Sequence, residues 1–136
     1  MYSINIWSIV VATVASFIIG SLWYSHFLFG EEWMALIKQS NKGIEETPFR
    51  QAWKLYIIQM IATLITFVIL GFTISILGIR NMSDGAFIGF FAWLGFNIPI
   101  GISELLWRKA PLKLIMIDSI YALLSLVIGG AIIAVL

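Results

Sequence analysis

The sequence predicts an all-α polytopic membrane protein, in which four transmembrane helices form an antiparallel bundle with both termini outside. Three observations support this prediction. Four long apolar runs are separated by polar connections. The 136 residues are 61% hydrophobic and 11% charged, whereas a soluble domain carries about 25% charged residues. Seven of the eight Lys and Arg residues belong to two of the three connections, which is the pattern of the positive-inside rule.

Each apolar run exceeds the roughly 20 residues that cross a hydrocarbon core of about 30 Å. Backbone polar groups in lipid must be paired within their own segment, which favours helices. The strict alternation typical of barrel strands is absent from these runs. We therefore predict one transmembrane domain, residues 1–136, with helices at approximately 4–29, 47–77, 86–107 and 112–136.

The connection at residues 30–46 is the only sizeable one. Within it, Glu31–Lys38 mixes apolar and charged side chains and is predicted to lie along the membrane surface. Thr47 and Pro48 then offer a capping hydroxyl and a proline at the first helical position, which predicts a helix start. The two later connections are short, so consecutive helices are expected to be antiparallel neighbours.

The distribution of basic residues predicts the orientation. Arg80 is the only basic residue in the second connection, whereas seven belong to the first and third: Lys38, Lys42, Arg50, Lys54, Arg108, Lys109 and Lys113. These two connections are therefore predicted to be cytoplasmic, and both termini extracytoplasmic. The expected location is the cytoplasmic membrane, with membrane lipid as a partner. Nucleic acid is not expected, because no basic stripe lies on a soluble face.

Small residues recur along the first predicted helix at four-residue intervals: Ser8, Ala12, Ser16 and Gly20. Helices associate in lipid through close packing of such residues. We favour contacts within one bundle, although an interface between copies, in a homo-oligomer, also fits this pattern. Association with other membrane proteins remains open.

Asp118 is the leading candidate for a functional residue, because it lies roughly 9 Å into the last helix and charge is costly in a membrane. The alternative is a structural acid that accepts hydrogen bonds from Tyr24 or Tyr121. Glu104 is a second candidate, although an ion pair with Arg108 at i+4 explains it equally well.

His26 is predicted to lie at the same depth as Glu104 and Asp118. Together they suit a proton relay, a cation site or an acid–base pair. Because they come from three helices without a metal-binding spacing, we predict no metal, and no sequence motif predicts a cofactor.

The third predicted helix carries Asn97 on roughly the same face as Trp93 and Glu104. Pro99 leaves the Gly95 carbonyl without its helical partner, which predicts a kink near the middle of the membrane.

Several motifs together resemble the bacterial domain-of-unknown-function family 1761. They are Ile19-Gly-Ser-Leu-Trp-Tyr-Ser25, Phe29-Gly-Glu-Glu-Trp33, Trp93-Leu-Gly-Phe96 and the stretch Pro111–Asp118. The resemblance implies a small polytopic membrane protein but carries no activity. This chain departs from the family at His26, where proline is usual, and at Asp118, where an amide is expected.

Three functions are compatible with these features. The first is a small oligomeric transporter or channel that uses the polar residues within the membrane. The second is a non-catalytic accessory or scaffold subunit of a larger membrane complex. A membrane-embedded enzyme acting on an apolar substrate is the least favoured, because the sequence contains no nucleophile elbow, P-loop or H-E-x-x-H motif.

Overall fold

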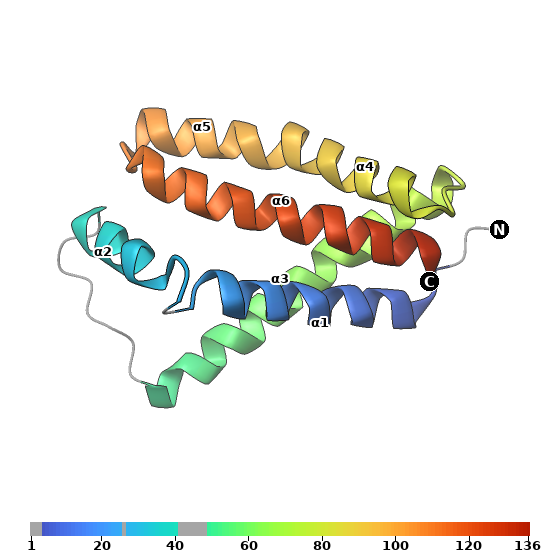
Figure 1. The fold of residues 1–136 in the computed structure, drawn as a ribbon, viewed down its shortest axis with the longest axis horizontal. Coiled ribbons are helices and arrows are strands. Elements are labelled where there is room, and N and C mark those ends of the chain that lie inside the picture. The colour runs from blue at the N-terminus through green and yellow to red at the C-terminus, as the bar shows by residue number, and fades with distance from the viewer. Residues whose placement is uncertain (1–3, 26, 41–48) are drawn as a thin grey trace.

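The structure, a computed structural model, describes residues 4–25, 27–40 and 49–136, and these residues form helices and no strands. Their order along the chain is α1 (Ile6–Trp23), α2 (Gly30–Ser40), α3 (Phe49–Ile76), α4 (Met82–Ala92), the π-helical turn η1 (Trp93–Asn97), α5 (Ile98–Trp107) and α6 (Leu112–Val135). Segments α4, η1 and α5 form one continuous rod (Figure 1).

Four helical segments are long and apolar enough to cross a membrane: Ile6–Trp23, Trp53–Ile76, Met82–Trp107 and Leu112–Val135. Many of their large apolar side chains are exposed, which suits a surface in contact with lipid rather than water. The chain is therefore an all-helical protein with the features of a membrane protein.

The first helix ends at Trp23, whereas the sequence places its end at residue 29. The Tyr24 N–H bonds to the Gly20 carbonyl, and the Gly30 N–H then closes a turn onto the Ser25 carbonyl. A Cβ atom at Gly30 would collide with the main chain of Tyr24 and Ser25, so this turn requires glycine. Helix α2 follows at once, within the predicted connection. Thr47 and Pro48 lie outside the described residues.

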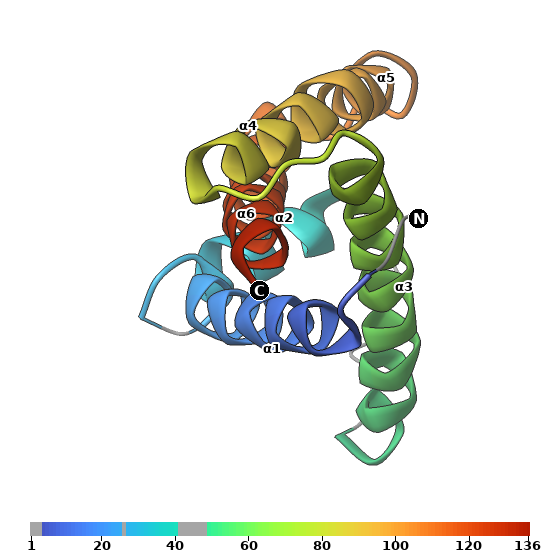
Figure 2. The same ribbon diagram turned by 90° about the vertical axis from the view of Figure 1, so that its right-hand side faces the viewer.

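Helix α6 is the centre of the arrangement. It lies between α1 and the α4–α5 rod and runs in the opposite direction to both (Figure 1). Helix α3 crosses the others obliquely (Figure 2). The core cluster includes Ala12 of α1, Phe67 and Leu70 of α3, and Ile133 of α6.

The contact between α4 and α6 is made by glycines. A Cβ atom at Gly89 would collide with the main chain of Leu126, and one at Gly85 with Gly130 and Ala134. The two backbones therefore approach as closely as in small-xxx-small helix pairs.

The predicted small-residue stripe of α1 faces the interior of the same chain. Ser8, Ala12 and Ser16 are buried. Ser16 Oγ lies 2.6 Å from Ser125 Oγ of α6, and a Cβ atom at Gly20 would lie 3.0 Å from the Tyr121 hydroxyl. These residues form contacts within one copy, which is the alternative that the sequence favours.

Candidate intramembrane polar site

Two helices form a pocket of about 190 Å³ where α5 faces α6. Asn97 and Glu104 are seven residues apart, close to two helical turns, so they face the same side of the η1–α5 segment. Asp118 and Ser119 face them from α6. We call this the carboxylate pocket; its lining residues are Asn97, Ile100, Gly101, Glu104, Ile115, Asp118 and Ser119.

Gly101 positions α5 against α6 beside this pocket. It is buried, and a Cβ atom built on it would lie 3.2 Å from Ile115 Cγ2. A side chain at this position would require the Ile115 side chain to shift, so the glycine allows close packing of α5 on α6 beside the pocket.

Tyr24 holds Asp118 from the opposite side. Its hydroxyl donates a hydrogen bond of 2.6 Å to Asp118 Oδ1. Burial, together with this hydrogen bond, raises the pKa of the Tyr24 hydroxyl, so Tyr24 remains the proton donor at neutral pH. Asp118 thus has one fixed oxygen and also borders the carboxylate pocket.

An aromatic cluster fixes the Tyr24 ring. It packs edge-on against Trp33 of α2, with ring centroids 5.4 Å apart, and against Tyr121 of α6, at 5.3 Å. The Tyr121 hydroxyl donates to the Ser16 carbonyl rather than to Asp118. Of the two tyrosines that the sequence offers as partners of Asp118, the structure therefore selects Tyr24.

Two tryptophans hold the backbone of α6 on either side of Asp118. Trp23 Nε1 donates to the Ile117 carbonyl at 3.0 Å, and Trp93 Nε1 donates to the Ser119 carbonyl at 2.7 Å. These bonds come from α1 and from the π turn, so Asp118 is positioned by both neighbours of α6. Neither of these two roles was predicted from the sequence.

The α4–α5 rod is distorted next to Pro99. The Ile98 N–H bonds to the Trp93 carbonyl, five residues earlier, which defines the π turn η1. Such turns supply one extra residue per turn and relieve the clash that a proline creates in a regular helix. The kink at Pro99 itself remains a prediction.

The structure does not bring all the candidates together. His26 lies outside the described residues. Arg108 donates its backbone N–H to the Glu104 carbonyl, and among the described residues no ion pair joins the two side chains. Among all the residues that the structure describes, no group of three His, Asp or Glu side chains is placed to hold a metal ion.

Comparison with known proteins assigns the chain to a family. The family model described as "Protein of unknown function (DUF1761)" matches residues 7–134. The chain belongs to this family. The match confirms the resemblance seen in the motifs and covers every residue of the carboxylate pocket. Neither the curated proteins nor the solved structures give a match to this DUF1761 protein.

Proposed function

We propose that this protein transports a small cation or a proton, which it binds in the carboxylate pocket. The observation that carries the proposal is the convergence of Asn97, Glu104 and Asp118 on one pocket. Two carboxylates in a membrane are costly and repel each other. A bound cation or a shared proton relieves that repulsion, and the neutral oxygens of Asn97 and Ser119 suit its remaining coordination.

The proposed setting is the cytoplasmic membrane, with both termini outside and the helices in an antiparallel bundle. Arg108, Lys109 and Lys113 surround the connection between α5 and α6, and their positive charge favours the cytoplasmic side. The carboxylate pocket would then open near the inner face of the membrane. Because four helices enclose little space, a complete pathway would form between copies in a homo-oligomer.

Flux into liposomes tests this proposal. The wild-type chain is reconstituted, a cation or pH gradient is imposed, and an internal pH- or cation-sensitive dye reports entry. We expect Asp118→Asn and Glu104→Gln each to lower the flux by about tenfold or more, since each removes a charge that stabilises the cation. Glu32→Gln is the matched control, because Glu32 is paired at the surface with Lys113 at 3.0 Å.

Circular dichroism confirms that each variant remains helical. Wild-type flux no greater than that of empty liposomes, for protons and for each alkali cation, would refute transport through this pocket. So would full activity in Asp118→Asn.

A second candidate function, an accessory or scaffold subunit, is favoured by the first half of α3. All side chains from Trp53 to Ala62 are exposed, whereas Phe67, Leu70 and Ile74 in the second half are buried. The exposed half includes Gln59, whose side chain reaches Thr63 of its own helix at 3.4 Å. An amide in lipid favours association with another helix, so this half suits contact with a second copy or another membrane protein.

Cysteine crosslinking tests this second candidate, because the chain has no native cysteine. Gln59→Cys is expected to give a crosslinked species in native membranes, either a dimer or a complex with a different protein. Ile69→Cys is the matched control on the same helix, since its side chain is 61% exposed in the packed half. Tyr56→Cys is a second probe, since Tyr56 is 64% exposed in the same half of α3. If neither probe crosslinks above the control, the subunit hypothesis fails.

A further inference from the structure

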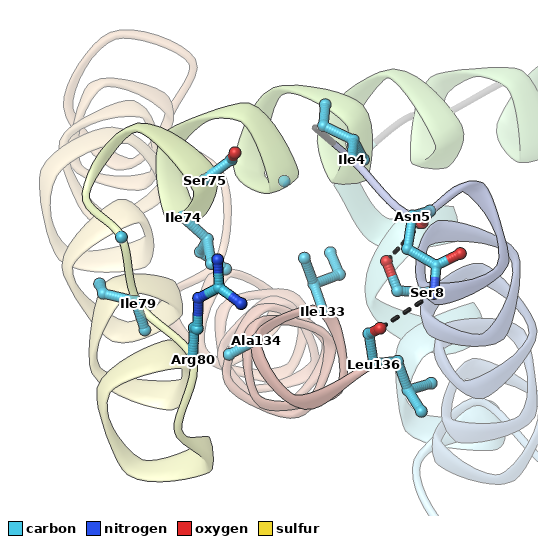
Figure 3. Close-up of a pocket in the computed structure, with 12 residues that line it drawn as sticks. Ile4, Asn5, Ser8, Ile74, Ser75, Ile79, Arg80, Ile133, Ala134 and Leu136 are labelled. Atoms are coloured by element: carbon cyan, nitrogen blue, oxygen red, sulfur yellow. Dashed lines mark hydrogen bonds between the residues drawn. The ribbon is translucent and has the colours of Figure 1, made fainter. Parts of the chain in front are cut away.

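A second pocket, of about 250 Å³, lies at the other end of the molecule and is unrelated to the carboxylate pocket. It is formed where α3 ends, where α1 begins and where α6 ends (Figure 3). Arg80, in the connection between α3 and α4, borders it. We call it the Arg80 pocket.

The end of α3 determines where Arg80 lies. Gly78 has a φ of 69°, the left-handed conformation that glycine adopts without strain. The Ile79 N–H bonds to the Ile74 carbonyl and the Gly78 N–H bonds to the Ser75 carbonyl, which is the hydrogen-bond pattern of a Schellman motif. This ending turns the chain back over the pocket, and Figure 3 shows the Arg80 guanidinium pointing into it.

Arg80 brings a positively charged and exposed side chain to this pocket. Within the part of the chain that the structure describes, its side chain makes no ion pair and no hydrogen bond. It is also the one basic residue outside the first and third connections, so the positive-inside pattern does not explain it. The guanidinium is therefore accessible, within this pocket, to a ligand of opposite sign.

The other polar groups of the pocket are already engaged. The Asn5 side-chain amide donates to the Leu136 carbonyl at 2.9 Å, and its oxygen accepts from the Trp7 N–H. The Ser8 hydroxyl donates to the Asn5 carbonyl. Ile74 and Ile133 are buried and provide an apolar wall. The guanidinium is therefore the group that distinguishes this pocket chemically.

We infer that the Arg80 pocket binds a phosphate group, supplied by a phospholipid headgroup or by free phosphate. The planar fork of an arginine matches phosphate oxygens with two parallel hydrogen bonds. The pocket is smaller than the roughly 300–1,000 Å³ of sites for drug-sized ligands, so it suits one small anionic group.

Binding to the full chain in maltoside micelles, which contain no phosphate, tests this inference. Native mass spectrometry counts bound phosphatidylglycerol as its concentration is raised. We expect one tightly bound lipid in the wild type and an affinity lower by about tenfold or more in Arg80→Gln, the loss typical of a hydrogen bond to a charged group. Arg80→Lys is expected to be intermediate, since it retains the charge without the fork.

Arg108→Gln is the matched control, because it removes one positive charge at the opposite end of the chain. A second arm adds inorganic phosphate to the wild type carrying the lipid. Displacement of the lipid identifies the phosphate group alone as the ligand, whereas retention identifies the complete phospholipid. Both results support the site.

Equal lipid affinity in the wild type and Arg80→Gln would overturn the inference, as would an equal loss in Arg108→Gln. A thermal melt of Arg80→Gln separates loss of the site from loss of the fold. Because Arg80 lies outside the carboxylate pocket, we expect cation flux in this variant to equal that of the wild type. The two proposals can therefore fail independently.

Discussion

The two halves of the α4–α5 rod contact α6 in different ways. In the α4 half, Gly89 brings the rod against the main chain of Leu126, and Gly85 brings it against Gly130 and the Ala134 methyl group of α6. In the other half, Asn97 at the end of η1 and Glu104 of α5 line, with Asp118 of α6, a pocket of about 190 Å³. One pair of helices thus provides both a close contact and a polar opening.

The boundary between the halves is the π turn η1. At its first residue, Trp93 bonds to the Ser119 carbonyl of α6, and at its last residue, Asn97 borders the pocket. A π turn changes the rotation of the residues that follow it relative to a regular α-helix. The glycine contact therefore fixes the spacing of the helices, while the π turn presents polar side chains to the space beyond it.

The largest expected effect comes from breaking the glycine contact. Gly89→Ala places a Cβ atom against the main chain of Leu126, and because main chain cannot move aside as a flexible side chain does, the helices must separate. We expect the free energy of unfolding to fall by about 3 kcal/mol, the upper part of the range for overpacking. Reversible unfolding in mixed micelles measures it.

Gly95→Ala is the control for this prediction, since a Cβ atom at Gly95 meets nothing within 4 Å. It is expected to leave stability nearly unchanged. Because Ala has a higher helix propensity than Gly, propensity cannot explain a loss of stability. Equal destabilisation by both substitutions would therefore mean that the close contact at Gly89 is not the cause.

A smaller loss of stability is expected at η1, the boundary between the two halves of the α4–α5 rod. Trp93→Phe removes the indole N–H that bonds to the Ser119 carbonyl and keeps an aromatic ring in place. We expect a loss of about 1 kcal/mol in the free energy of unfolding, the net value of a typical hydrogen bond, and a lower cation flux because Ser119 borders the pocket. Trp107→Phe is the matched control, since Trp107 is 84% exposed. A change no larger than that of the control would show that Trp93 does not hold this boundary.

Hydropathy and length were sufficient to predict four helices long and apolar enough to cross a membrane, because both properties belong to each segment separately. The end of α1 was not predictable in this way. Trp23 and Phe29 are both apolar, and the helix ends between them because Gly30 permits a turn onto Ser25. The oblique path of α3 was also not predicted, since a helix apolar on all sides carries no signal for its crossing angle.

Asn97, Glu104 and Asp118 were identifiable as candidates because polar groups are costly in lipid. Their convergence depends on how α5 faces α6, which the spacing along one helix cannot determine. The sequence did contain one unused signal, because Gly85-x-x-x-Gly89 matches a motif for close helix pairs. The hydrogen bonds from Trp23 and Trp93 to carbonyls of α6 had no such signal, since the acceptors are backbone atoms.

Helix α1 packs against α6 in a third way, through hydroxyl groups, and the smallest effect on stability is expected there. Here Ser16 Oγ meets Ser125 Oγ at 2.6 Å, so hydroxyls take the place of glycine contacts. A double-mutant cycle of Ser16→Ala and Ser125→Ala is expected to give a coupling energy of about 0.6 kcal/mol, the average for such bonds between membrane helices. Thr73→Ala paired with Ser125→Ala is the control, because the Thr73 hydroxyl bonds within its own helix, and no coupling is expected. A coupling as large as the effect of Gly89→Ala would place the strongest contact of α6 on the α1 side and reverse the ranking of its neighbours.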